Sequence, residues 1–351
     1  KMFFLPASYA MPDGLLPRFG DDPGTSARSY GPTMEAAYNA YLDPVLLRLL
    51  PQTNQWSSVF YGRNPEQAAG DLPEKSELFR DSGHAILRAG GEKKLTSVFK
   101  FSRYGGFHDH FDKLSFVFYG CGAELGVDPG RAKSQAYNLP IHTDWYKATL
   151  GHNAVLVNQK PQAAGDGELS LFAEVNGFAL TEARLTAGFQ AVSQRRLLFQ
   201  SPEYLLVLDR LEALDDAPRT FDWVYHGTGE SFDIQGLSTG AGWKDYPGME
   251  YVQDIRTGES SAGVRGTFTS TKAVTHLLMD AQSPTQILAG NGPLSSVNER
   301  VPLIIARRTG RSQIFLAALE PTPNGASPDL TALAWKKSGD DLVLEVTRKN
   351  G

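Results

Sequence analysis

The stretch FHDHFDKLSF, residues 107–116, combines two histidines and two aspartates with an apolar, alternating run that is typical of a β-strand. On a regular strand His108 and His110 would point to the same side, because residues two apart share one face. A bend would separate them, so that one could serve a metal and the other a substrate. The chain has only 7 histidines, so we interpret this pairing with carboxylates as a functional site. The alternative is a polar surface loop beside a strand.

The composition limits the class of protein. A chain of 351 residues with 41% hydrophobic content can bury one large core or two domains. Its net charge of −5 and isoelectric point of about 5.8 argue against nucleic-acid binding, although a local cluster of arginines would suffice for an acidic sugar. Cys121 is the only cysteine, which excludes an internal disulfide and a cysteine-rich zinc site. No apolar run approaches the roughly 20 residues of a membrane span.

The first part of the chain predicts helices. Apolar residues recur at spacings of three and four over 33–50, with an interruption at Pro44 and an end at Pro51. Shorter helical pieces are expected over 54–60 and 65–69. Residues 1–6 have a short apolar run without the features of a signal peptide, and we expect the chain to begin inside a longer protein.

From Gly83 onward the sequence predicts strands. A hairpin is expected over 85–101, with Gly90 and Gly91 in its turn. Such frequent strands, separated by Gly, Pro, Asp and Asn turns, favour a mainly β fold: a large antiparallel β-sandwich preceded by a short helical segment. The further strands are expected at 113–119, 154–157, 169–175, 189–199, 204–211, 220–226, 274–279, 303–308, 313–319 and 342–346.

Two further residues extend the histidine cluster. Asp128 ends a predicted strand at a Pro-Gly turn, and His152 enters the next one. Together with His110 they form a set of two histidines and one carboxylate, which zinc accepts in tetrahedral geometry. Taken singly, Asp128 would be a turn cap and His152 a core histidine with one hydrogen bond.

Three motifs in this order resemble a known family: YGGxHxHFDKLSF at 104–116, DxG at 128–130 and WYxxTxxHNxV at 145–155. They resemble the C-terminal β-sandwich of heparinase II/III-like polysaccharide lyases. That group includes alginate lyases of polysaccharide lyase families 15, 17 and 39, as well as heparin and heparan lyases. The resemblance is densest over 83–162 and thin afterwards.

The resemblance implies an (α/α) toroid packed on an antiparallel β-sandwich, with the active cleft between them. Residues 1–80 would be the C-terminal end of the toroid and residues 81–351 the sandwich. Most of the toroid, with its own catalytic residues, is expected outside this chain, and a second chain could supply it. The family also implies a periplasmic or secreted protein.

The resemblance also implies roles for single residues. His108 matches the catalytic histidine, and Tyr137 resembles a cleft tyrosine of the family 17 alginate lyases. The set of His110, Asp128 and His152 matches a structural metal site for a divalent ion, usually zinc (Zn2+).

The chemistry of such lyases is β-elimination. A base removes the C5 proton of a uronic acid, the C4–O bond breaks, and charge on the carboxylate needs a cation or hydrogen-bond donor. His108 could act as acid, base or cation, and Tyr137 or Tyr146 could donate a proton. Arg103 and Arg131 could bind carboxylates bidentately. The alternative is that both are solvated arginines on the surface without a role in binding.

The remaining polar residues have weaker predictions. We expect Asp112 and Lys113 to anchor the turn. His142 and His226 are weaker candidates for the cleft, and a structural role is preferred for both. Alginate is the preferred substrate and heparin or heparan sulfate the second choice. Two other classes stay open: a non-catalytic, metal-stabilised sugar-binding sandwich, and a metal-dependent hydrolase with Asp109 as its base.

Overall fold

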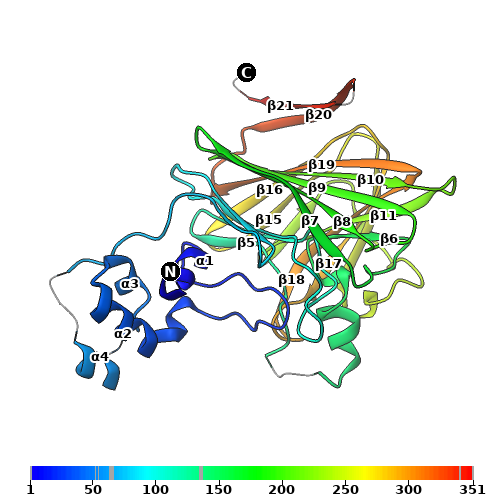
Figure 1. Ribbon diagram of the computed structural model, residues 1–351. Helices are drawn as coiled ribbons and strands as arrows, with labels where there is room; N and C mark the ends of the chain where they lie inside the picture. The colour runs from blue at the N-terminus through cyan, green and yellow to red at the C-terminus, as the bar shows by residue number, and fades with distance from the viewer. Residues whose placement is uncertain are drawn as a thin grey trace.

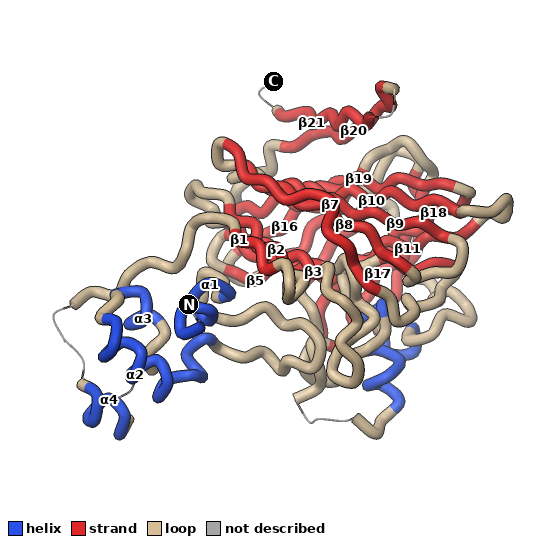
Figure 2. The backbone as a smooth tube through the Cα atoms, viewed as in Figure 1, coloured by secondary structure: helices blue, strands red, loops and turns tan. Residues whose placement is uncertain are grey.

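The protein is mainly β, with its helices gathered near the N-terminus and a short helical stretch beside the sandwich (Figure 2). The computed structural model describes residues 2–51, 53, 55–62, 67–133, 137–339 and 341–349. Within these residues no helix has the length and apolar character needed to cross a membrane.

The N-terminal helices are short. Pro44 takes the first turn of its helix, where its missing N–H costs nothing, and Asp43 caps that helix by accepting from Val45 N at 3.0 Å. The predicted interruption at Pro44 is therefore confirmed. Of the helix predicted over 65–69, residues 65 and 66 lie outside the described part, and 67–69 are not helical. The helical elements of this part are η1 Met2–Phe4, α1 Leu5–Tyr9, η2 Ala27–Tyr30, α2 Gly31–Tyr41, α3 Pro44–Arg48 and α4 Trp56–Tyr61. Short helical elements follow later in the chain: η3 His142–Tyr146, η4 Thr149–Gly151 and η5 Met249–Tyr251.

A five-stranded antiparallel sheet follows the helices, in the order β1-β2-β3-β4-β5. Its first strand pairs with β2 and precedes residue 81, so the β region begins slightly earlier than the predicted boundary. The strands are β1 Glu77–Phe79, β2 His84–Arg88, β3 Thr96–Lys100, β4 Phe116–Gly120 and β5 Ala123–Gly126.

An eight-stranded sheet, in the order β12-β15-β16-β19-β10-β9-β8-β7, forms one large layer of the sandwich (Figure 1). Every pairing in it is antiparallel, as predicted. The strands in chain order are β7 Asp166–Val175, β8 Phe178–Thr186, β9 Val192–Gln200, β10 Leu205–Ala213, β12 Ser231–Ile234, β15 Arg265–Thr269, β16 Ala273–Met279 and β19 Ser312–Pro323.

A six-stranded sheet, in the order β13-β14-β17-β18-β11-β6, forms the facing layer, and a C-terminal hairpin pairs β20 with β21. One continuous apolar core joins the three larger sheets, with Phe99, Phe116, Trp223 and Phe315 fully buried in it. The strands are β6 Val155–Val157, β11 Arg219–His226, β13 Ser238–Thr239, β14 Gln253–Ser260, β17 Thr285–Pro293, β18 Arg300–Gly310, β20 Leu330–Ser338 and β21 Asp341–Arg348.

An extended segment leaves α1 and runs along the sandwich before the chain returns to the helices (Figure 1). Arg18 in this segment forms an ion pair with Glu124 of β5. Further along, Asp21 N donates to His108 O at 3.0 Å. The segment therefore brings residues near the N-terminus to the FHDHFDKLSF loop.

Candidate active site

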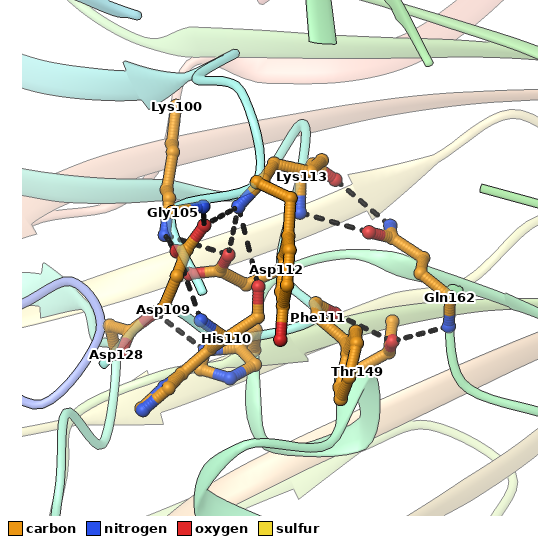
Figure 3. A network of polar contacts seen from close by, with 12 residues as sticks. Lys100, Gly105, Asp109, His110, Phe111, Asp112, Lys113, Asp128, Thr149 and Gln162 are labelled. Carbon is orange, nitrogen blue, oxygen red and sulfur yellow. Dashed lines mark hydrogen bonds and ion pairs between the residues drawn. The ribbon is translucent and has the colours of Figure 1, made fainter. Parts of the chain in front are cut away.

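The loop between β3 and β4 is held by a buried network of two lysines and two aspartates (Figure 3). Lys100 Nζ lies 2.6 Å from the carboxylate of Asp109 and 2.8 Å from that of Asp112. Lys113 Nζ lies 2.6 Å from Asp109 and 3.4 Å from Asp112. Because buried charges are tolerated when they are paired and hydrogen-bonded, this network ties the loop to the end of β3.

The electrostatics of the network favour the charged forms. Burial by itself would raise the pKa of Asp109 and Asp112, but the lysines outweigh it and hold both pKa values below their usual range. The prediction that Asp112 and Lys113 anchor the turn is confirmed. The prediction that Asp109 could be the base of a hydrolase requires correction. Its carboxylate is bound to both lysines rather than free, so it does not fit that role.

Asp21 joins the two histidines of the loop. Its Oδ2 lies 2.7 Å from His108 Nδ1 and its Oδ1 lies 3.0 Å from His110 Nε2. Burial would raise the pKa of Asp21, but these two hydrogen bonds lower it below its usual value. A carboxylate only accepts, so both ring nitrogens donate to it.

Gly20 makes the approach of this segment possible. A Cβ at this position would lie 2.5 Å from His108 O, and the residue has a φ of +58°. Only glycine combines that backbone conformation with so close a contact.

The two histidines differ in exposure although they share Asp21. The side chain of His108 is 72% exposed and that of His110 is fully buried. The loop bends rather than continuing as a regular strand, so the bend considered above is the arrangement found. In the neutral ring, an Nδ1 that donates to Asp21 leaves the lone pair on Nε2.

Aromatic and basic side chains surround His108. The ring centroid of Tyr137 lies 6.4 Å from that of His108, 6.1 Å from that of Phe107 and 4.8 Å from that of His142. The guanidinium of Arg131 lies 5.9 Å from the Tyr137 ring, and its Nε donates to Asp21 O at 2.9 Å. The structure thus brings together His108, Tyr137 and Arg131, which the sequence placed in one site.

The buried side of the loop brings together His110, Asp128 and His152. One ligand atom from each lies within 4.8 Å of the others, and all three residues are buried. His110 Nδ1 is buried and has no hydrogen-bond partner among the residues that the structure describes. His152 Nδ1 lies 2.6 Å from Asp128 Oδ2, and its Nε2 lies 3.0 Å from Tyr146 O. Burial lowers the pKa of His152, but the charge of Asp128 outweighs it and raises that pKa.

This donor set fits a divalent metal ion. A histidine ligand commonly donates its other ring N–H to an oxygen, as His110 Nε2 does to Asp21 and His152 Nε2 does to Tyr146 O. Both Nδ1 atoms are then directed to the space beside Asp128. Zinc bonds of about 2 Å hold ligands no more than about 4 Å apart, so a small side-chain rotation would close the set.

Two residues predicted for the cleft require correction: Tyr146, a possible proton donor, and His226, a weaker candidate. Tyr146 is fully buried and His226 is 2% exposed, so neither presents its side chain to a polymer in this chain. Burial raises the pKa of Tyr146 to about 12 and lowers that of His226 to about 3. Tyr146 therefore retains its proton and His226 stays uncharged near neutral pH.

The predictions for Arg103 and His142 have different outcomes. Arg103 is exposed, and among the described residues no hydrogen bond or ion pair ties it to the histidine cluster. His142 is buried beside Tyr137, and burial lowers its pKa. The role of Arg103 remains a prediction, whereas the His142 ring packs against the Tyr137 ring.

Two residues of the site, Asp21 and Phe107, were missed. Asp21 is separated from the histidines by most of the helical segment, and only the turn sequence Gly20-Asp21-Asp22 marks it. Phe107 is 68% exposed, and Lys147 Nζ donates to its carbonyl at 2.6 Å. An exposed aromatic residue next to the histidines was the signal available for Phe107.

The comparison with known families agrees with this geometry. The heparinase II/III-like, C-terminal family matches residues 71–281. This match covers more than half of the chain, and the chain belongs to that family.

Two characterised relatives are similar to part of the chain. An exo-oligoalginate lyase from Saccharophagus degradans is 29% identical over 170 residues, which is 43% of this chain and 23% of the relative. An alginate lyase from Stenotrophomonas maltophilia is 29% identical over 166 residues, which is 42% of this chain and 22% of the relative. The alignments thus span less than a quarter of each relative.

Solved structures share the fold. The heparan sulfate lyase HepC from Pedobacter heparinus superposes with a TM-score of 0.71 at 15% identity, over 97% of this chain and 50% of that one. A structure of heparinase III has a TM-score of 0.71 at 14% identity, over 99% of this chain and 52% of that one. These likenesses confirm the predicted β-sandwich fold.

Proposed function

We propose that this chain supplies one wall of the active site of a polysaccharide lyase, a carbon–oxygen lyase that cleaves a uronic-acid polymer by β-elimination. The observation that carries the proposal is His108: it is 72% exposed, it is hydrogen-bonded to Asp21 through Nδ1, and the Tyr137 ring lies beside it, with the Arg131 guanidinium against that ring. Family membership supports the same class of reaction.

In this proposal His108 is the base. Its Nε2 lone pair accepts the C5 proton, while Asp21 holds the ring in the required tautomer and stabilises the imidazolium that forms. Asp21 is a positioning residue because it acts through His108. Apo geometry is compatible with this role, since catalytic contacts tighten once substrate is bound.

Tyr137 is the proposed acid. Its hydroxyl would protonate the C4 oxygen as the glycosidic bond breaks, and the neighbouring His142 and Arg131 hold its ring in place. Arg131 Nη2, which has no partner among the described residues, is available to the substrate carboxylate, whose negative charge grows during proton removal. The proposal includes a second wall of the cleft, contributed by toroid helices outside this chain or by a second chain.

We further propose that His110, Asp128 and His152 hold a structural divalent metal, with zinc as the first candidate. Such an ion would brace the loop by fixing His110, and through Asp21 it would stabilise the orientation of His108. The reaction itself does not pass through this site, because His110 and His152 are fully buried.

Alginate is the proposed substrate, and the relatives named above that are alginate lyases support it. Heparin or heparan sulfate is the second candidate, supported by the fold shared with heparan sulfate lyase HepC. Both polymers carry the uronic acid that β-elimination requires. The family membership would place the protein in the periplasm or outside the cell.

The test is direct. The full protein is incubated with alginate, heparan sulfate and hyaluronan, and the ultraviolet absorbance of the C4–C5 double bond is followed. We expect a signal with alginate. No signal with any of the three polymers would refute the lyase, and new reducing ends without this absorbance would indicate a hydrolase.

A matched pair of variants tests the acid. Tyr137→Phe removes the hydroxyl and keeps the ring, so turnover should fall by about 10²-fold or more. Tyr104→Phe is the control, because Tyr104 stacks on Phe111 in the same loop at 5.6 Å between centroids and has no proposed chemical role. Equal rates for the two variants would exclude Tyr137 as the acid.

A further inference from the structure

The outer face of the eight-stranded sheet is divided into an apolar and a basic half. Register places Leu208 of β10 between Leu197 of β9 and Leu316 of β19. The C-terminal hairpin packs on this apolar half through Leu330 and Leu333 of β20, and Figure 1 shows it lying across this layer. The hairpin therefore accounts for the apolar half only.

Two residues further along the strands, the same face carries a row of arginines. Register places Arg195 of β9 opposite Arg210 of β10 on one side and opposite Arg184 of β8 on the other. Like charges directly opposite each other destabilise a sheet. A row of this kind in a chain of net charge −5 is therefore not explained by folding.

The three arginines are not neutralised equally. Arg184 forms a two-pronged contact with Glu168, at 3.0 and 2.7 Å. Arg195 reaches Glu182 only at 3.4 Å. Within the described part of the chain, Arg210 makes no ion pair or side-chain hydrogen bond, so its guanidinium is available to a ligand.

Two of these arginines, Arg195 and Arg210, line a cavity of about 530 Å³ between the sheet and the hairpin. Arg195, Arg210 and Lys337 contribute three positive charges, against one carboxylate from Glu212. Trp335 of β20 contributes an aromatic wall, and Gln282 fixes its backbone through two hydrogen bonds of 2.7 Å. The indole N–H of Trp335 is buried and finds no partner within the described part of the chain.

We propose that this cavity is a second, non-catalytic binding site for an acidic oligosaccharide. Guanidinium groups bind carboxylates bidentately, and an indole offers a flat apolar face to a sugar ring. Ser312 and Gln313, which also line the cavity, can exchange hydrogen bonds with sugar hydroxyls. The choice of a uronic-acid sugar over other anions rests on the proposed function.

The cavity and the proposed active site lie on opposite faces of one strand. Arg196, the neighbour of Arg195 on β9, points inward and donates to Leu114 O in the FHDHFDKLSF loop at 2.7 Å. Successive strand residues point to opposite faces, so Arg195 faces away from that loop. A polymer held at the outer site would raise the local concentration of cleavable chain near the protein.

The resonance of the Trp335 indole N–H provides a site-specific test. The full protein, labelled with ¹⁵N and assigned with a Trp335→Phe variant, is titrated with a saturated tetra-uronate. A neutral tetrasaccharide and sodium sulfate are titrated separately. We expect only the tetra-uronate to shift this resonance in a saturable way. A shift of the same size with the neutral sugar, or saturation by sulfate alone as an adventitious anion only, would overturn the proposal.

Variants link the shift to the arginines. Arg195→Gln combined with Arg210→Gln should weaken binding by about tenfold or more, because two charge-assisted contacts are lost. Arg184→Gln, in the same row but outside the cavity and already paired, should leave the affinity unchanged, and Arg210→Lys alone should retain part of it. Unaltered affinity in the double variant would contradict the site.

The outcome is separable from that of the proposed function. A shift of the Trp335 resonance without cleavage of any polymer would refute the lyase and leave the outer site. Cleavage without the shift would support the lyase and refute the outer site.

Discussion

His108 and His110 lie two residues apart on one loop and share one carboxylate, yet their surroundings are opposite. His108 is 72% exposed among aromatic and basic side chains, whereas His110 is fully buried beside Asp128 and His152. The bent loop, held by the Lys100 network, keeps them apart. Two histidines that are close in sequence can therefore have different environments when a buried charge network fixes the backbone between them.

The largest expected effect tests the exposed side. His108→Ala should lower kcat/KM on the cleaved polymer by about 10² to 10⁴-fold, the usual contribution of a general base. Its melting temperature should stay close to that of the parent because the side chain is largely exposed. Ultraviolet absorbance measures the first quantity and calorimetry the second. His276→Ala, at the distant strand β16, is the control; activity within about threefold of the parent for both variants would break the comparison.

The next effect tests the network that separates the two sides. Lys100→Met leaves Asp109 and Asp112 with one lysine between them, and removing one partner of a buried ion pair costs about 3–5 kcal/mol. Chemical denaturation should report a loss of this size. Lys93→Met, which removes a partly exposed pair with Glu203, should cost no more than about 1 kcal/mol. Similar losses for the two variants would argue against the network as the anchor of the loop.

The buried side is tested by His110→Ala. Removal of this ring leaves buried polar groups unpaired, which costs about 1–3 kcal/mol, and it should also abolish metal retention in elemental analysis. A chelator should lower the melting temperature of the parent and leave that of His110→Ala unchanged, while His108→Ala should keep its metal. Loss of activity in His110→Ala with full metal content and stability would contradict the separation between a structural role for His110 and a catalytic role for His108.

The smallest effect concerns His84, a largely buried histidine without a carboxylate partner. Its Nδ1 lies 3.1 Å from Tyr9 OH, and its Nε2 has no partner among the described residues. Burial lowers its pKa from 6.5 to about 4. The charged groups that also act on it are Lys100 and Lys113, which lower its pKa, and Asp109 and Asp112, which raise it.

The sign of the resulting pH dependence follows from linkage. The unfolded chain takes up the proton near pH 6.5 and the folded chain near pH 4, so the stability present above pH 6.5 is lost as the pH falls toward 4. The shift sets an upper limit of about 3 kcal/mol, and partial solvation reduces this to about 1 kcal/mol. His84→Gln should flatten the curve of unfolding free energy against pH in this range, and Tyr9→Phe, which keeps the imidazole, should not. An unchanged slope in His84→Gln would assign the dependence to other groups.

Patterns that are local in the chain were predictable. The strands over 204–211 and 313–319 are dense in β-branched and aliphatic residues, and β10 and β19 form there. Strands with mixed polar sequences, such as β14 and β15, were missed because their half-exposed residues lack a strong apolar alternation.

The burial of Tyr146 and His226 could not be read from the sequence. Both occur next to residues of the candidate site, but the helical turn η3 His142–Tyr146 and strand β11 direct their side chains into the interior. A polar aromatic residue near a functional motif has the same sequence signature whether it faces a cleft or a core.

The amino-acid sequence was sufficient to predict three features: the FHDHFDKLSF stretch, the later Asp128 and His152, and the alternating runs that form a β-sandwich. These features depend on residue type and on spacing within one element. Three other features are visible only in the folded structure. Asp21 bridges His108 and His110, the two histidines have different surroundings, and Arg195 and Arg210 meet above a cavity. Such contacts join residues far apart in sequence, and their formation depends on strand register and on which groups the whole fold removes from water.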